Sequence, residues 1–579
     1  MSEESHQPET SVRFEPEEIA PPVLAAGLAF QMVAFMVAGV VLTVVIVGRA
    51  AGQPESYIAW ATFASLLIAG ICTALQAKTL WRIGSGHVLL MGTSAVFIAV
   101  CVSALVSGGP ALMATLIVIS SVLQFALATK LSWLRNIITP AVSGTVIMLI
   151  PFTVMPIAFN LLMEVPEQHV NTSAVIIAAV TIFVSAALTL AAKGIWRLWT
   201  PLLGILIGTV TAAFLGVYDV SPILKADWIG IPDGGWEFMD LSFKPAFWAL
   251  LPGFLFVTVV GMIETIGDSI AIQRVSRRAQ LAPDYRVVQG AVGADGVGNL
   301  LSGIACTVPN TTYSSSVAVT ELTGVASRQV GLFVGIIFVV LAFLPKFQQI
   351  VMSIPNPVAG AYLAIILALL FVVGVRIVMR DGMDFRKAII VGLSIYIGLG
   401  FQFELIFPDL LQNELGQFLQ NGMTAGGITA IGLTLLMSLF SSRKRKLETT
   451  VEVAQIDEIR AFLFKHASAW KWNEESLNKL NLAAEETVLT LIGNPEESEL
   501  PEPRALQISM SRDGNEAQLE FVATVGGSNL EDQMLLLEEA DITNVVDDLS
   551  LRILREMTSS IRHQQYFDTD VITLTVRAS

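Results

Sequence analysis

The chain has 579 residues, of which 54% are hydrophobic and 14% are charged, and its mean hydropathy is +0.67. These values exclude an ordinary soluble protein and indicate an integral membrane protein. Residues 447–579 contain 25 acidic and 10 basic residues and so account for the whole net charge of −15, whereas residues 1–446 contain 24 of each. We therefore predict a neutral membrane part followed by an acidic soluble part.

Residues 1–20 are acidic and lack the apolar stretch of a signal peptide, so we expect a cytoplasmic N-terminal tail. Residues 21–442 contain fourteen apolar runs that we interpret as membrane spans. Basic residues follow the even-numbered runs, and the positive-inside rule then places both termini in the cytoplasm of a bacterial-type inner (plasma) membrane. The expected spans are 24–47, 58–77, 88–106, 111–131, 135–160, 173–191, 198–217, 247–272, 287–304, 310–323, 329–345, 357–378, 386–406 and 421–440.

Two of these runs, 88–100 and 308–324, are short and interrupted by Gly, Pro and hydroxyl residues. They are the third and the tenth spans, so they occupy matching places in two seven-span halves. The fifth and twelfth spans match as well, through "PAVSG" (140–144) and "PNPVAG" (355–360). Similar segments seven spans apart imply an inverted repeat, and paired broken helices are typical of a transporter's substrate site. The alternative is that both segments are kinked packing helices.

Carboxylates interrupt the eighth span in "VVGMIETIGDSIAIQRVSRRAQ" (259–280). Glu264 and Asp268 are four residues apart and therefore share one helical face. Because charges at membrane depth are costly, we expect this face to line the bundle interior. Asp295, in "GADGVG" (293–298), is a third carboxylate on the short ninth span.

A half-helix that begins after Tyr313 would direct free N–H groups and the positive end of its dipole into the bundle. Ser314, Ser315 and Ser316 would add hydroxyl groups there. Donors opposite the Glu264 carboxylate suit a flat, neutral, amide-like ring.

Two of the carboxylates have alternative roles. Asp268 could instead pair with Arg274 or Arg277 or cap a neighbouring helix, and Asp295 could be a structural acceptor for the turn of the tenth span. Glu264 has no partner nearby in the sequence. The five histidines do not cluster, so no metal site is expected.

At these residues the chain resembles the nucleobase–ascorbate transporter family, the xanthine/uracil permeases, from about Pro21 to Phe440. The resemblance implies fourteen spans in two inverted repeats, a core domain that moves against a gate domain, and uptake of nucleobases with H⁺ or Na⁺. The shared motifs are "GLAFQ" (27–31), "GICTALQ" (70–76), "GTSAVF" (92–97), "GTVIMLI" (144–150), "ETIGD" (264–268), "GADGVGNLLSG" (293–303), "PNTTYSSSVAVTELTGVASR" (309–328) and "IPNPVAG" (354–360).

The resemblance also implies roles for individual residues. Glu264 matches the glutamate that hydrogen-bonds the base, and Phe97 resembles the aromatic residue that packs near the ring. Asp268 and Asp295 match aspartates that are important for transport. Ser315 and Ser316 stand where the family has Gln or Glu followed by Asn, and Met32 replaces the usual His of the first span. Serine cannot make a bidentate amide contact, so the substrate can differ from xanthine or uracil.

We interpret residues 443–452 as a basic linker and residues 453–579 as a cytoplasmic α+β domain. Residues 480–494 predict an amphipathic helix, 505–525 predict two strands, and 549–576 predict a helix followed by strands. This order resembles the ATPase-like fold of anti-sigma factor and histidine kinases. Thr490 replaces the family's Mg²⁺-binding Asn, so we expect a degenerate module that does not hydrolyse ATP.

These features predict a secondary active symporter, not an enzyme, that needs no cofactor and carries a nucleobase-like solute with H⁺ or Na⁺. The lipid bilayer, a second copy in a homodimer and a cytosolic regulatory protein bound to the C-terminal domain are the expected partners, and nucleic acid is not. One alternative is an anion transporter or channel with the same seven-plus-seven architecture, similar to the sulfate permeases. The other is a transporter-derived sensor that signals through its C-terminal domain.

Overall fold

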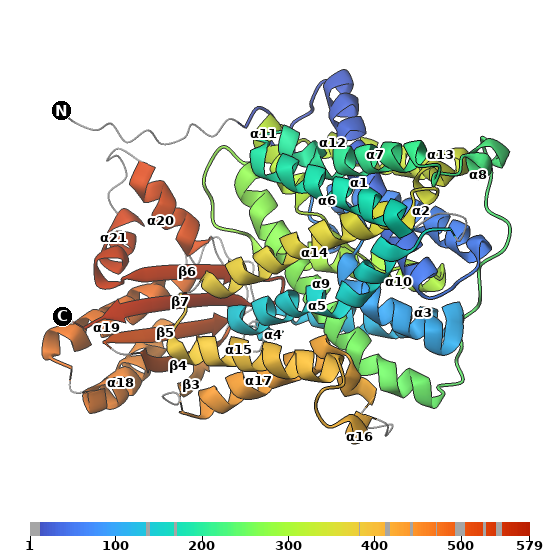
Figure 1. Cartoon of the computed structure of the whole chain (residues 1–579). Coiled ribbons are helices and arrows are strands. Elements are labelled where there is room, and N and C mark those ends of the chain that lie inside the picture. The colour runs from blue at the N-terminus through green and yellow to red at the C-terminus, as the bar shows by residue number, and fades with distance from the viewer. Residues whose placement is uncertain are drawn as a thin grey trace. The chain divides into compact units, whose positions relative to one another are not determined.

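A computed structural model describes residues 12–134, 139–166, 171–380, 382–411, 417–440, 444–470, 472–492, 504–513, 515–524, 529–539 and 547–578 (Figure 1). The chain divides into two compact units. The first comprises Met1–Arg278 and Gly290–Thr434, and the second comprises Ala279–Gln289 and Leu435–Ser579. Most of the predicted N-terminal tail (1–11) and residues 441–443 at the start of the predicted linker lie outside the described residues.

The first unit is helical, as predicted. Its helices are α1 (Pro22–Ala50), α2 (Glu55–Ala77), α3 (Ile98–Thr129), α4 (Leu131–Leu134), α5 (Pro140–Met163), α6 (Asn171–Ala191), α7 (Trp196–Phe214), α8 (Ser221–Lys225), α9 (Pro245–Ser276), α10 (Tyr285–Ile304), α11 (Ser315–Thr323), α12 (Arg328–Ala342), α13 (Pro345–Met352), α14 (Asn356–Met379), α15 (Phe385–Gln402), α16 (Pro408–Leu411) and α17 (Gly422–Phe440). Two short strands, β1 (Met91–Thr93) and β2 (Asn310–Thr312), and the 3₁₀ turns η1 (Ala95–Phe97) and η2 (Gln417–Gln420) complete it.

Among the described residues, nine helical segments are long and apolar enough to cross a membrane, or ten when the α12–α13 pair, bent by 86°, is one span. The chain is therefore a multi-pass membrane protein. One of the nine segments, Ala95–Thr129, is interrupted at Gly108 and at Gly109, whose φ is +72°, a value that favours glycine. This break separates the predicted third and fourth spans. The predicted tenth span contains only β2 and the nine-residue α11.

The helices of the first unit form two packing groups. In the first group α2 packs along α12, α3 packs on α9, and α1 packs on α2, α3 and α12. In the second group α5 packs along α14, α6 packs on α7 and α14, and α15 packs on α5. Contacts between the groups, such as those of α1 with α7 and of α5 with α9, are sparser. Helices α5 and α14 both begin with a proline in the first turn, where its missing N–H costs nothing.

The second unit has a five-stranded antiparallel sheet in the order β3-β4-β5-β7-β6. Buried residues of α18, α19 and α21 form one core with alternate residues of β4, β5 and β7. The predicted helix and strands of this region are confirmed. The elements are β3 (Arg445–Thr450), η3 (Val453–Gln455), α18 (Ile456–Ala467), η4 (Ser468–Trp470), α19 (Glu474–Ile492), β4 (Ala505–Asp513), β5 (Glu516–Ala523), α20 (Leu530–Glu539), α21 (Asp547–Met557), β6 (Ser560–Gln565) and β7 (Asp570–Arg577).

The prediction of a linker at 443–452 is wrong for residues 445–450, which form strand β3. This strand pairs with β4 along its length, with Leu447 opposite Ile508. Leu447 is partly buried against the core. A basic composition suggested a linker, but the backbone N–H and C=O groups of β3 pair with the free edge of β4, and composition does not reveal such pairing.

Candidate substrate site

The two predicted broken segments meet in space. β1 and β2 pair in antiparallel fashion, with Gly92 opposite Thr311. The pairing continues beyond the strands, because the Ser94 N–H donates to Pro309 O at 3.0 Å and the Tyr313 N–H donates to Leu90 O at 2.9 Å. Each strand leads into a helical segment, η1 and α3 after β1 and α11 after β2. The unwound segments thus satisfy each other's backbone groups inside the protein, the setting in which non-helical backbone is tolerated at membrane depth.

Asp268 of α9 is buried against this strand pair. Its Oδ2 accepts a hydrogen bond from Thr312 Oγ1 at 2.8 Å, and its Oδ1 accepts one from Ser314 Oγ at 2.5 Å. Arg277 instead forms an ion pair with Glu17 at 3.3 Å. The structure therefore places Asp268 at the break, beside the start of α11, and pairs Arg277 with another carboxylate.

Glu264 lies one helical turn earlier on α9 and is only partly exposed. The side chain of Thr311 interacts with its carboxyl group. One turn further back is Gly261, where an added Cβ would lie 3.0 Å from Thr311 Cγ2 and 3.5 Å from Phe97 Cε2. The bare backbone at Gly261 therefore lets the Phe97 ring and Thr311 approach α9 closely, beside Glu264.

The three predicted serines differ in their contacts. Ser314 bonds Asp268, as described above, and Ser315 is the first residue of α11 and is half-buried. Ser316 is fully buried, and its hydroxyl donates to Tyr313 O at 2.6 Å. The hydroxyl of Ser314 thus binds a carboxylate of the site, whereas the hydroxyl of Ser316 binds a backbone carbonyl group three residues earlier.

Asp295 of α10 lies at the centre of a buried polar network. Its Oδ2 accepts hydrogen bonds from Gln124 Nε2 at 2.7 Å and from Thr265 Oγ1 at 3.2 Å. Asn299 Nδ2 donates to Gln124 Oε1 at 2.8 Å, and Asn299 Oδ1 accepts from the Asn310 N–H at 2.7 Å. The polar acceptor for β2 is therefore Asn299, one turn after Asp295. Asp295 itself ties α10 to α3 and α9.

Sequence reasoning did not identify Gln124, Thr265, Thr312 or Asn299. The two threonines and Asn299 lie inside the quoted motifs, so their position was a usable signal. Gln124 is the one polar amide in an apolar helix and is separated from Asp295 by 171 positions, so only the fold reveals the pairing. Within the described ranges, no group of three or more His, Cys, Asp or Glu residues is arranged to hold a metal ion.

The profile of the permease family that contains the xanthine and uracil permeases matches residues 25–406. The chain belongs to this family. The permease is 27% identical over 425 residues to the putative purine permease CPE0397 of Clostridium perfringens, with 72% of this chain and 90% of that protein covered. It is 28% identical over 424 residues to the xanthine permease XanP of Escherichia coli strain K12, with 70% and 90% covered. Residues after 406, which include the whole β3–β7 sheet, lie outside the family profile.

Among solved structures, the permease resembles SLC26A9, an anion transporter in its murine form, with a TM-score of 0.51 and 12% sequence identity. The likeness covers 74% of this chain and 67% of that chain. At this level of identity it concerns the fold of the membrane part, a helical polytopic architecture, and carries no information on the substrate.

Proposed function

We propose that this permease is a secondary active symporter that imports a flat, nucleobase-like solute together with H⁺ or Na⁺. The observation that carries the proposal is the pairing of β1 with β2 directly beside the carboxylates of α9. Relatives named as purine and xanthine permeases, aligned over 90% of their length, support the substrate class.

In this proposal Glu264 binds the solute. Glu264 is a partly exposed residue. Its carboxyl group can accept two hydrogen bonds when ionised or donate one when protonated, which suits an amide-like ring edge. Phe97 would pack against the ring, and the start of α11 at Ser314–Ser316 would provide N–H and hydroxyl groups. Asp268 and Asp295 would shape or carry the coupling ion, because each is a buried carboxylate held by hydroxyl or amide donors on other elements.

The proposal extends to the whole membrane part. In this proposal the membrane part has fourteen spans in two inverted seven-span repeats, both termini of the protein are in the cytoplasm, and the protein forms a homodimer. The matching places of β1 and β2 in the two halves support the repeat, and the basic residues after the even-numbered predicted spans support the orientation.

Three buried or half-buried carboxylates around one break argue against an anion as the substrate. An anion beside Glu264, Asp268 and Asp295 would be repelled unless these groups were protonated. Hydroxyl groups such as those at the start of α11 can bind an anion, but the Ser314 hydroxyl donates to Asp268 and the Ser316 hydroxyl donates to the backbone oxygen of Tyr313.

The decisive experiment reconstitutes the full-length protein in liposomes and measures uptake of radiolabelled xanthine, uracil and adenine under an inward H⁺ gradient and, separately, an inward Na⁺ gradient. We expect accumulation of at least one base with one of the two gradients. Electrogenic sulfate or chloride flux without uptake of any base would refute the proposal and support an anion carrier. Binding of a base without flux would refute transport and support a sensor.

A further inference from the structure

The segment Ala279–Gln289 comprises part of the connection after α9 and the first five residues of α10, and by its contacts it belongs to the second unit. It is called the joining segment below. The Ala282 N–H donates to Asp532 Oδ1 at 2.6 Å, and the rings of Tyr285 and Tyr566 lie 5.2 Å apart between centroids. The Phe567 N–H donates to Gln289 Oε1 at 2.8 Å. These contacts involve α20 and the turn between β6 and β7, so the joining segment is docked on the C-terminal domain.

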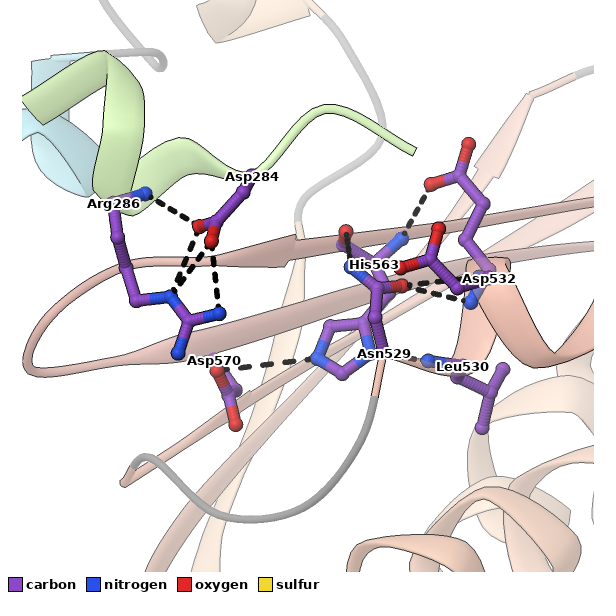
Figure 2. Close-up of polar contacts among 8 residues, drawn as sticks. Asp284, Arg286, Asn529, Leu530, Asp532, His563 and Asp570 are labelled. Atoms are coloured by element: carbon purple, nitrogen blue, oxygen red, sulfur yellow. Dashed lines mark hydrogen bonds and ion pairs between the residues drawn. The ribbon is translucent and has the colours of Figure 1, made fainter. Parts of the chain in front are cut away.

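Polar contacts hold together the part of the C-terminal domain on which the joining segment docks, at the start of α20 and in β6 (Figure 2). Asn529 caps α20, because its Oδ1 accepts from the Glu531 N–H at 2.9 Å, and the Leu530 N–H donates to His563 Nδ1 at 2.9 Å. Arg286 binds Asp284 at 2.8 Å and, in Figure 2, directs its guanidinium toward Asp570 of β7. The cap fixes the start of α20, and with it Asp532, so the acceptor for Ala282 is held in place.

The other end of the joining segment is fixed within the first unit. Arg278 donates to Glu18 at 2.7 Å and to Arg13 O at 2.9 Å, and these residues lead into α1. Only three residues, 279–281, separate this anchor from the docked Ala282. The segment is therefore held at both ends, by the first helix group and by the C-terminal domain.

The C-terminal domain is also joined covalently to the second helix group. α17 packs closely on α15, where an added Cβ at Gly422 would lie 2.7 Å from Gly398 O. α17 ends at Phe440 and β3 begins at Arg445, so the connection can span at most roughly 18 Å. By contrast α10 packs on α2 and α3, because the Cβ positions of Gly298 and Gly303 lie near Cys72 and Val118.

We propose that the C-terminal domain is an internal brake on transport, which acts by tying the α9–α10 connection to the end of α17 when it is docked on Ala279–Gln289. Exposing a central site to each side of the membrane in turn requires movement of one helix group against the other. That movement must stretch the short connection after α17 or break the docking contacts. The docked state therefore resists the movement, and release of the domain increases the transport rate. The inference rests on the proposed transport function, although the docking itself does not.

The first test locks the brake. Ala282→Cys and Asp532→Cys are introduced together into the full-length protein, because the 2.6 Å contact keeps the two Cα atoms within about 7 Å, the outer limit for a disulfide. The native cysteines Cys72, Cys101 and Cys306 are buried and give little background. We expect oxidation to form the disulfide and to lower the initial rate of [³H]xanthine uptake in liposomes, and a reductant to restore it in the same sample, which excludes misfolding as the cause. Failure of the disulfide to form, or uptake at the parental rate after it has formed, would overturn the proposal.

The second test releases the brake. Asp532→Ala with Tyr566→Ala removes the hydrogen bond to Ala282 and the ring contact with Tyr285, and should shift docking toward release by about tenfold. We expect faster xanthine uptake with unchanged KM, together with faster hydrogen exchange in residues 279–289. The matched control is Asp457→Ala with Phe464→Ala, whose side chains are on the exposed face of α18. Faster exchange without faster uptake, or no change in exchange, would contradict the brake.

The exchange measurement also separates the two proposals. If the parental protein moves no base at all, the transport proposal fails, yet exchange in residues 279–289 still reports whether the domain docks there. If the parental protein transports xanthine and neither the lock nor the release changes its rate, the brake alone fails.

Discussion

At the scale of single residues, Glu264 is the group whose chemistry can be tested most directly. Glu264→Gln keeps the shape and most hydrogen-bonding capacity but removes the titratable proton. We expect the variant to retain weak binding of a base but to lose the pH dependence of uptake. Binding is measured by thermal shift and uptake in liposomes between pH 5.5 and 8. Uptake with unchanged rate and pH profile would show that the carboxylate neither binds the solute nor couples the ion, and Asp268 or Asp295 would then be the next candidates.

His563 makes the C-terminal domain sensitive to acid. Burial, and secondarily the nearby Arg286, lower the pKa of this imidazole to about 4. The unfolded chain binds a proton at a pKa near 6.5, so the free energy of unfolding should be highest above that pH and should fall as the pH drops from about 6.5 to about 4, by up to roughly 3 kcal/mol. The Leu530 N–H donates to Nδ1, so protonation at this atom also removes the bond that holds the start of α20.

The measurement is hydrogen exchange of α20 and β6 in the full-length protein at pH 7 and pH 5, corrected for intrinsic exchange rates. We expect lower protection at pH 5. His563→Gln should reduce this difference, whereas His466→Gln, on the surface of α18, should leave it intact. Equal protection at both pH values in the parental protein would show that folding does not lower the pKa of His563.

At the scale of elements, the crossing of α2 and α12 depends on two glycines. An added Cβ at Gly70 would lie 2.7 Å from Gly335 O, and the same distance separates a Cβ at Gly335 from Gly70 O. Both contacted atoms are backbone oxygens, which cannot move without shifting a helix. We expect Gly70→Ala to destabilise the protein by about 1–3 kcal/mol, measured as a lower melting temperature in detergent.

Gly392→Ala on α15 is the control for this crossing, because no atom lies within 4 Å of the added Cβ. Removing a glycine from a helix with free space should raise stability by roughly 0.5–1 kcal/mol. Equal melting temperatures for Gly70→Ala and Gly392→Ala would show that the helices separate at little cost.

Arg49 links the end of α1 to the start of α14, and so joins the two helix groups. Its guanidinium donates to Met352 O and Asn356 Oδ1, each at 2.7 Å, and to Ile354 O at 3.3 Å. Arg49→Met keeps the aliphatic stem but loses all three bonds, and we expect a loss of about 2–4 kcal/mol. Lys244→Met, at an exposed ion pair with Asp240, should lower the melting temperature much less, because solvent screens such a pair. Comparable melting temperatures for the two variants would contradict a structural role for Arg49.

At the scale of the whole molecule, the membrane part should fold without the C-terminal domain. It has a balanced charge, and the hydrophobic cores of the two units are separate. A chain that ends at Phe440, before β3, should therefore keep its melting behaviour and its preference among bases. Its uptake rate should rise, because the docking contact with Ala279–Gln289 is lost. A change in substrate preference on truncation, or loss of binding, would show that the domain contributes to the site itself.

Much of this architecture could be predicted because the responsible signals are local in the chain. Hydropathy identifies the apolar helices, since any segment of about 20 apolar residues can cross a bilayer. The Gly, Pro and hydroxyl residues at 88–100 and 308–324 mark the two unwound segments, and the one-turn spacing of Glu264 and Asp268 places both on one face. The strands around Asp513 follow from the same kind of local pattern.

Only the tertiary structure decided which of these local elements meet. The bond between Gln124 and Asp295 joins residues 171 positions apart, and no periodicity in either helix indicates it. The same holds for β3, whose basic residues resembled a linker, and for Ala279–Gln289, whose contacts with α20 and with the turn between β6 and β7 join residues about 250 or more positions apart. Local patterns report how a segment can bury its own side chains and satisfy its own backbone, whereas these contacts depend on the partner that packing brings to it.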